Sequence, residues 1–116
     1  MTFSLYKDED VQEPFERIDA EQARRMVDEG AALLIDVREP DEWEEVHAPQ
    51  ARHVPLQTFL SNPTQYVQPS DSVVFVCARG QRSAVAAEMA SAVGVQNAYN
   101  LEGGMIDWQE RGYPVE

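Results

Sequence analysis

The sequence predicts a single α/β domain in which helices flank both faces of a central, mostly parallel β-sheet. Short apolar runs of strand length alternate along the chain with segments of helical character. Strands that alternate with helices imply right-handed crossovers, and therefore parallel pairing. A chain of 116 residues supports one core, and its 43% hydrophobic content is ordinary for a globular protein. Residues 1–14 mix charge with scattered apolar residues, so we assign them to an N-terminal arm and residues 15–116 to the domain.

The first predicted helix and strand come directly after this arm. Asp19 is a suitable helix N-cap, Gln22 stands three residues later as its reciprocal partner, and Gly30 is a suitable stop. The buried face of this helix is expected to contain Ala23, Met26 and Val27. Residues 31–37 form a continuous apolar run, broken only by Asp36, that is too short for a helix after a glycine. This run predicts a buried strand in a parallel sheet.

Three short elements are predicted next. Residues 40–46 begin with proline and carry acids around a tryptophan, which favours a short helix with proline in its first turn. Residues 53–55 fit a brief strand ended by proline, and residues 57–60 fit a helical turn. The acids in this part of the chain are interpreted as a solvated charged face: Glu39, Asp41, Glu42, Glu44 and Glu45.

The second half of the domain repeats the alternation. Its predicted elements are a buried strand at residues 73–76, an alanine-rich helix at 83–93, a strand at 97–101 and a last helical piece around 106–108. Ser83 is a natural N-cap for the alanine-rich helix, and Gly94 closes it. Gly103 and Gly104 break the chain before the last helical piece.

Charge and composition exclude several classes of function. The formal net charge is -12, and such a surface repels phosphate backbones and anionic lipids. We therefore expect neither nucleic-acid nor membrane binding. No apolar run has the length of a signal peptide or a membrane span, and the expected location is the cytoplasm. A single cysteine cannot form an internal disulfide, and two histidines with one cysteine show no zinc spacing. We expect a monomer with no metal and no cofactor.

The only cysteine of the chain begins a short loop at the carboxyl end of a predicted strand, where parallel sheets bind ligands. The candidate site consists of Cys77, Ala78, Arg79, Gly80, Gln81, Arg82 and Ser83. A short loop that leads into a helix aims successive N–H groups at one point, and the helix dipole adds positive potential there. Gly80 permits a positive φ and a close approach of the backbone to a ligand.

Two arginines concentrate positive charge beside this thiol. From His53 to Glu110 the chain contains no lysine, and no arginine except Arg79 and Arg82. Such surroundings lower the pKa of a cysteine below its free value of about 8.5 and make it reactive. The alternative, in which Cys77 is an inert buried hydrophobe, fits its apolar strand but not the loop and the arginines.

Four motifs carry a family resemblance, and they occur in the family's order along the chain. The most specific is Cys-x-x-Gly-x-Arg-Ser at 77–83. Before it comes a strand ending in Asp-Val-Arg at 36–38, followed by Trp43, Glu44 and His47; after it come Asn-Leu-Glu-Gly-Gly-Met at 100–105 with Trp108, and Gly-Tyr-Pro-Val at 112–115. With these motifs the chain resembles a single-domain rhodanese, of the sulfurtransferase family, over residues 15–116. The resemblance implies a rhodanese-like α/β fold and a sulfurtransferase activity.

In that family the cysteine thiolate, here Cys77, takes the sulfane sulfur of a donor such as thiosulfate, and the resulting persulfide passes it to a thiol or cyanide. The loop residues 78–83 would hold the donor and the persulfide, and a sulfur-donor or acceptor protein is a further potential partner. Arg79 and Arg82 would orient an anionic donor, or Arg82 would mainly fasten the loop. An alternative is a sulfur-relay or regulatory protein-binding module with little turnover of free thiosulfate. Phosphatase activity is disfavoured, because cysteine phosphatases have five residues between nucleophile and arginine, and this loop has four.

One stretch departs from the family pattern of Gly-His-Ile-Pro-Gly-Ala. Val46 and Gln50 stand where the two glycines are common, so either Val46 is strained by a positive φ or the turn is locally different. Other residues are interpreted as structural. We expect an ion pair or loop anchor from Asp36 and Arg38, and a hydrogen-bonded His47. Trp43 and Trp108 are expected to be packing residues.

Overall fold

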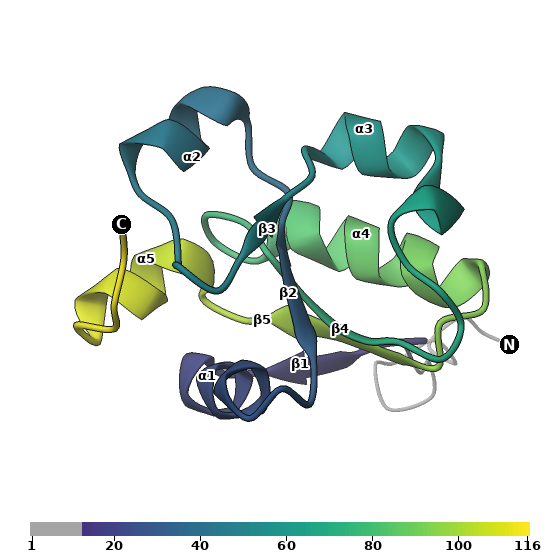
Figure 1. Cartoon of the computed structure of the whole chain (residues 1–116), viewed down its shortest axis with the longest axis horizontal. Coiled ribbons are helices and arrows are strands. Elements are labelled where there is room, and N and C mark those ends of the chain that lie inside the picture. The colour runs from purple at the N-terminus through teal and green to yellow at the C-terminus, as the bar shows by residue number, and fades with distance from the viewer. Residues whose placement is uncertain (1–12) are drawn as a thin grey trace, which may run out of the picture.

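The computed structural model describes residues 13–116 and contains a five-stranded sheet (Figure 1). The strands are β1 (Glu16–Ile18), β2 (Leu33–Asp36), β3 (Arg52–His53), β4 (Ser72–Val76) and β5 (Asn97–Leu101). Their order in the sheet is β1-β5-β4-β2-β3, and each neighbouring pair runs parallel. The predicted parallel α/β fold is confirmed. Most of the predicted arm, residues 1–14, lies outside the described residues.

Helices cover both faces of this sheet. They are α1 (Ala20–Asp28), α2 (Pro40–Glu45), α3 (Leu56–Ser61), α4 (Gln81–Ala92) and α5 (Gly104–Glu110), and a 3₁₀ turn spans Pro63–Gln65. Figure 1 shows α3 and α4 on one side of the strands and α1 and α5 on the other. Within residues 13–116, no helix is long and apolar enough to cross a membrane.

The core consists of two clusters separated by the sheet, and β4 supplies both of them. Successive side chains of a strand point to opposite faces. Val73 and Phe75, followed by Cys77, pack with the α3 and α4 side, whereas Val74 and Val76 pack with the α1 and α5 side. These β4 side chains are fully buried, so β4 is covered on both faces of the sheet. The thiol of Cys77 directly follows this strand.

Local signals explain where most elements begin and end. Asp19 caps α1 by accepting a hydrogen bond of 2.8 Å from the backbone N–H of Gln22. Gly30 adopts a φ of 76° just beyond α1 and ends it, as predicted. Proline begins α2, as its position in the sequence indicated. The strand predicted at 31–37 is shorter, and the elements predicted at 53–55 and 57–60 lie at Arg52–His53 and Leu56–Ser61.

Two features of the fold differ from the prediction. The edge strand β1 was not predicted, because its three residues are mainly charged and form a strand by pairing with β5. Ser83 is not a helix N-cap, because α4 begins two residues earlier than predicted, at Gln81. Gly80 occupies the N-cap position with a φ of 99°, a conformation that other residues rarely adopt.

The first turn of α5 packs directly on the start of the cysteine loop. The N–H groups of Met105 and Ile106 donate to the carbonyl oxygens of Cys77 and Ala78 over 2.8 and 3.2 Å. A Cβ atom at Gly104 would lie 2.3 Å from the Ala78 carbonyl oxygen, which no real contact allows. The loop and α5 can therefore approach this closely only because residue 104 is glycine.

We expect Gly104→Ala to destabilise the protein more than Gly112→Ala. Both glycines have a positive φ, which costs about 1–2 kcal/mol for an L residue, but a Cβ at Gly112 would meet nothing within 4 Å. Overpacking against the backbone adds about 1–3 kcal/mol at Gly104 alone. Urea unfolding of the two variants measures the difference, and equal losses would contradict the close contact.

Candidate active site

The cysteine loop turns directly from β4 into α4. Cys77 follows the last residue of β4 at the carboxyl end of the strand, and α4 begins four residues later at Gln81. Gly80 makes this turn possible through its positive φ, and its backbone lies close to the end of β5, where a Cβ would meet the Leu101 carbonyl oxygen at 3.5 Å. Of the predicted site residues, 77–83, the loop brings Gly80 and Ser83 into contact with the sulfur of Cys77, whereas Arg79 and Gln81 are exposed.

Hydrogen-bond donors converge on the sulfur. The backbone N–H groups of Gly80 and Ser83 donate to Cys77 Sγ over 3.1 and 3.3 Å, and Ser83 Oγ lies 3.2 Å from it. Cys77 itself is only 1% exposed. The site is therefore a buried thiol inside a ring of polar groups, and not a sulfur open to solvent.

Burial and hydrogen bonding act on the Cys77 thiol in opposite directions. Burial is the largest influence and raises its pKa, because the thiolate loses solvation. The Ser83 hydroxyl and the N–H groups of Ser83, Gly80 and Arg79 stabilise the thiolate. Together these hydrogen bonds outweigh burial and hold the pKa of Cys77 below its ordinary value, in the predicted direction.

Asn100 is a residue of this site that the sequence interpretation missed. It lies on β5, is fully buried, and accepts a hydrogen bond of 2.5 Å from Ser83 Oγ. Its side-chain nitrogen donates to the Gly80 carbonyl oxygen over 3.0 Å and to Glu102 Oε2 over 2.8 Å. An amide in a predicted strand of a sheet covered by helices on both faces was the available signal, since buried polar groups require partners.

The two arginines of the loop have different surroundings. Arg82 makes two hydrogen bonds to the Glu42 carboxylate, of 2.8 and 3.0 Å, and so ties the loop to α2. These bonds raise the pKa of Arg82 and lower that of Glu42 to about 2. Glu42 is thus an exception to the predicted solvated face. Arg79 is exposed, and within residues 13–116 it has no ion-pair partner.

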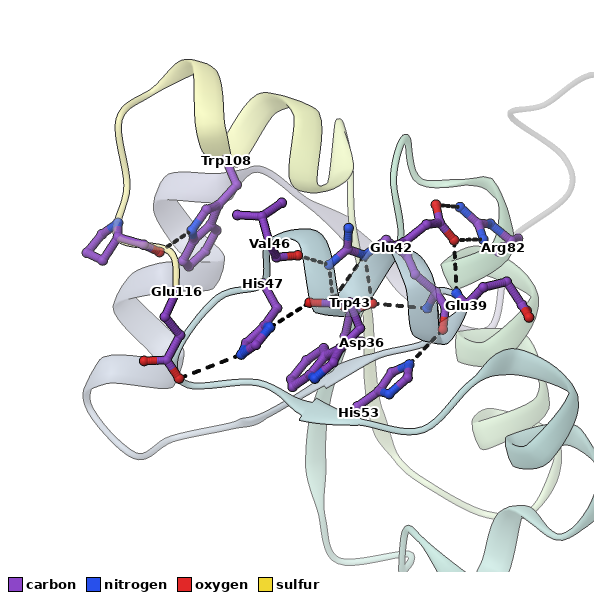
Figure 2. Close-up of polar contacts among 12 residues, drawn as sticks. Asp36, Glu39, Glu42, Trp43, Val46, His47, His53, Arg82, Trp108 and Glu116 are labelled. Atoms are coloured by element: carbon purple, nitrogen blue, oxygen red, sulfur yellow. Dashed lines mark hydrogen bonds and ion pairs between the residues drawn. The ribbon is translucent and has the colours of Figure 1, made fainter.

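The segment after β2 is anchored by a buried ion pair (Figure 2). Arg38 and Asp36 are both almost fully buried, and Arg38 Nη2 lies 2.8 Å from Asp36 Oδ2. Arg38 also donates to the Val46 carbonyl oxygen over 2.7 Å. The predicted ion pair or loop anchor is confirmed. The strain considered for Val46 is wrong, because its φ of -166° is extended, and Gln50 also has no positive φ. The turn is locally different and needs no glycine at either position.

An aromatic stack completes the same region. Trp43 lies between two imidazole rings, with centroid distances of 3.6 Å to His47 and 4.7 Å to His53 (Figure 2). His47 Nδ1 donates to the Trp43 carbonyl oxygen over 2.8 Å, because a carbonyl can only accept. The structural interpretation of His47 and Trp43 is confirmed. Trp108 is fully buried beside α1, as expected of a packing residue.

The fold and the loop define an α/β domain with a cysteine at the carboxyl end of a central strand. A family model described as a Rhodanese-like domain matches residues 19–111. The chain belongs to the rhodanese-like family.

Solved structures of similar proteins agree with this assignment. A rhodanese-related protein from Thermoplasma volcanium shares 29% identity with a TM-score of 0.76, over 88% of this chain and 98% of that protein. A protein of unknown function from Rhodopseudomonas palustris, described as a possible tyrosine phosphatase, has the same identity of 29% and TM-score of 0.76, over 88% and 85% of the two chains. A thiosulfate sulfurtransferase from Pseudomonas aeruginosa shares 25% identity with a TM-score of 0.75, over 88% of this chain and 20% of that protein.

We expect alkylation of Cys77 by iodoacetamide to follow a single ionisation with a pKa below that of a free cysteine thiol. The physical reason is the ring of donors, which favours the thiolate despite its burial. The pH dependence of the alkylation rate, followed by intact mass, measures this pKa, and Cys77→Ser serves as the unreactive control. A pKa at or above the free value would contradict the arrangement.

Glu42→Gln is expected to reduce stability at neutral pH by no more than about 1 kcal/mol, because both members of its ion pair are about one-third exposed. The carboxyl pKa of about 2 lies below its unfolded value, so the contribution is complete above about pH 4.3 and is lost as the pH falls towards 2. Denaturant unfolding at pH 7, 4 and 2 measures the difference from the original protein. Glu45→Gln, an exposed neighbour on α2, is the control. A difference that grows on acidification would contradict this account.

Proposed function

We propose that this protein is a sulfurtransferase that carries sulfane sulfur as a persulfide on Cys77. The observation that carries the proposal is the convergence of Gly80 and Ser83 N–H groups on a thiol whose pKa is lowered. Membership of the rhodanese-like family supports it, as does the similarity to a thiosulfate sulfurtransferase. The donor would be thiosulfate or a persulfide.

The reaction consists of two displacements at sulfur. The Cys77 thiolate attacks the outer sulfur of the donor, a new S–S bond forms, and the S–S bond of the donor breaks. The leaving group, sulfite from thiosulfate or a thiolate from a persulfide, departs with the electron pair. An acceptor thiol or cyanide then attacks the outer sulfur, and the Cys77 thiolate leaves with the second pair. The sulfur atom is passed on and the protein is regenerated.

The loop supplies stabilisation at each displacement. N–H groups that already point at the sulfur stabilise negative charge there without reorganisation. A thiol that is 1% exposed is best reached by a donor that presents its transferable sulfur as a terminal atom. Exposed Arg79 would attract the anionic oxygens of such a donor. Arg82 acts mainly through the loop, because its guanidinium is held by Glu42.

A second candidate is a relay that takes sulfur from one protein or small persulfide and turns over thiosulfate poorly. The pairing of Arg82 with Glu42 favours it, because Arg79 is then the one loop cation left for a dianionic donor on a protein of net charge -12. The same pairing disfavours a phosphatase. An arginine whose two terminal nitrogens both bind a carboxylate has fewer free N–H groups for bidentate binding of a phosphoryl group.

The proposal is tested by intact mass after incubation with thiosulfate or with a low-molecular-weight alkyl persulfide. We expect a gain of one sulfur atom that a reductant removes and that Cys77→Ser does not show. Loading by both donors supports the free enzyme, and loading by the persulfide alone supports the relay. No gain with either donor, in protein whose thiol is reduced, would overturn a persulfide on Cys77.

The same assay separates the two candidates further through Arg79→Gln. If thiosulfate is a donor, loss of the Arg79 charge should slow the transfer of sulfur from thiosulfate to Cys77 about tenfold. This factor corresponds to the weakest hydrogen bonds that involve a charged group. Transfer from an alkyl persulfide should be slowed less. Arg52→Gln is the control, because Arg52 is exposed on β3 and has no ion-pair partner in the described part of the chain. Equal slowing by both variants would indicate a general charge effect and no role for Arg79.

A further inference from the structure

A chain of hydrogen bonds extends from the Cys77 sulfur to a side chain of β5. It runs from Cys77 Sγ to Ser83 Oγ over 3.2 Å, and from Ser83 Oγ to Asn100 Oδ1 over 2.5 Å. Asn100 lies on β5, the neighbour of β4 in the sheet (Figure 1). Asn100 and Ser83 are both fully buried, so solvent does not compete for their polar atoms.

The surroundings of Asn100 fix the direction of every hydrogen bond in this chain. Its side-chain nitrogen faces the Gly80 carbonyl oxygen and the Glu102 carboxylate, and both of these groups can only accept. The amide therefore uses its two N–H groups on them, and its oxygen must face Ser83. Since that oxygen only accepts, the Ser83 hydroxyl must be the donor in the bond of 2.5 Å.

This direction has a consequence for the sulfur. A serine hydroxyl has one proton, and here it is directed at Asn100, so a lone pair of Ser83 Oγ faces Cys77 Sγ. A lone pair at 3.2 Å is a good acceptor for a thiol S–H, but it is unfavourable for a thiolate. The thiolate can use this hydroxyl as a donor only if the proton turns away from Asn100.

We propose that Asn100 is a positioning residue that holds the Ser83 hydroxyl proton away from the sulfur while Cys77 is a thiol and releases it when the thiolate forms. The S–H proton passes to a base in solution, and the hydroxyl rotates about its Cβ–Oγ bond from Asn100 Oδ1 to Cys77 Sγ. No other covalent bond changes. When a persulfide forms, the charge moves to the outer sulfur, and the hydroxyl proton returns to Asn100.

The charged groups around this chain are largely paired. Arg82 of α4 pairs with Glu42 of α2, and Asp36, the last residue of β2, pairs with Arg38. Beyond Asn100, Arg17 pairs with both Glu102 and Glu13. Arg79 of the loop is exposed. Opposite charges in contact largely cancel at a distance. The direction of the Ser83 hydroxyl, in direct contact with the sulfur, is therefore expected to have a separable effect on its ionisation.

A double-mutant cycle on the Cys77 pKa tests this coupling. Asn100→Ala frees the hydroxyl for the thiolate, so we expect it to lower the pKa of Cys77 by about one unit in the presence of Ser83, and not in the Ser83→Ala background. Loss of the contact between Asn100 and the Gly80 carbonyl is common to both backgrounds and cancels in the cycle. Asn97→Ala, at an exposed position of β5, is the matched control. An equal shift in both backgrounds would overturn the proposal.

A second measurement leaves Asn100 in place, in case its removal prevents folding. The side-chain amide signals of Asn100 in ¹⁵N-labelled protein should move at the pH where Cys77 ionises, because Oδ1 loses its donor there. The movement should disappear in Ser83→Ala. Signals that do not move in the original protein, or that move equally in Ser83→Ala, would overturn the proposal. The inference rests on the proposed function only in taking the thiolate as the reacting species. Because both tests read ionisation and not sulfur loading, its failure and that of the persulfide are distinguishable.

Discussion

The structure around the thiol depends on one constraint, the passage from β4 into α4 in a very short turn. Gly80 satisfies it by adopting a φ of 99° at the N-cap position. The same conformation points the Gly80 N–H at the Cys77 sulfur and brings the Gly80 carbonyl within reach of Asn100. A residue with a side chain would either be strained by the positive φ or change the turn, and a changed turn would no longer direct the N–H of residue 80 at the sulfur. Strand, turn and helix thus form the sulfur site together.

Three neighbouring elements hold this turn by different physical means. α5 does so by contact and backbone hydrogen bonds, because Gly104 lets its first turn approach the Ala78 carbonyl. α2 does so by charge, through the partly exposed ion pair between Glu42 and Arg82. β5 does so by buried hydrogen bonds through Asn100. Ion pairs that remain accessible to solvent contribute little to stability, so α5 and β5 define the turn while α2 mainly orients Arg82.

The sequence was sufficient to predict the parallel α/β fold, the strands that carry continuous apolar runs and the loop around Cys77. These features depend on local patterns such as the apolar strand β4 and the glycines that follow helices. β1 could not be predicted in this way, since its strand conformation comes from pairing with β5. The pairing of Glu42 with Arg82 and the contacts of Asn100 were missed for a related reason. Each is a contact between residues far apart in the chain, which no local pattern contains. The start of α4 was placed two residues late because Ser83 was taken as the N-cap, whereas Gly80 occupies that position.

A buried cysteine that reacts as a thiolate must meet two opposing requirements. It needs donors that stabilise the charge during reaction, but a thiolate that persists at rest is also the form most susceptible to oxidation. Backbone N–H groups cannot be withdrawn, so Gly80 and Ser83 favour the thiolate at all times. The hydroxyl of Ser83 differs from them because it can rotate between two acceptors. In our proposal the second acceptor is Asn100. The Ser83 hydroxyl donates to Asn100 while Cys77 is a thiol, and donates to the sulfur only when Cys77 is a thiolate.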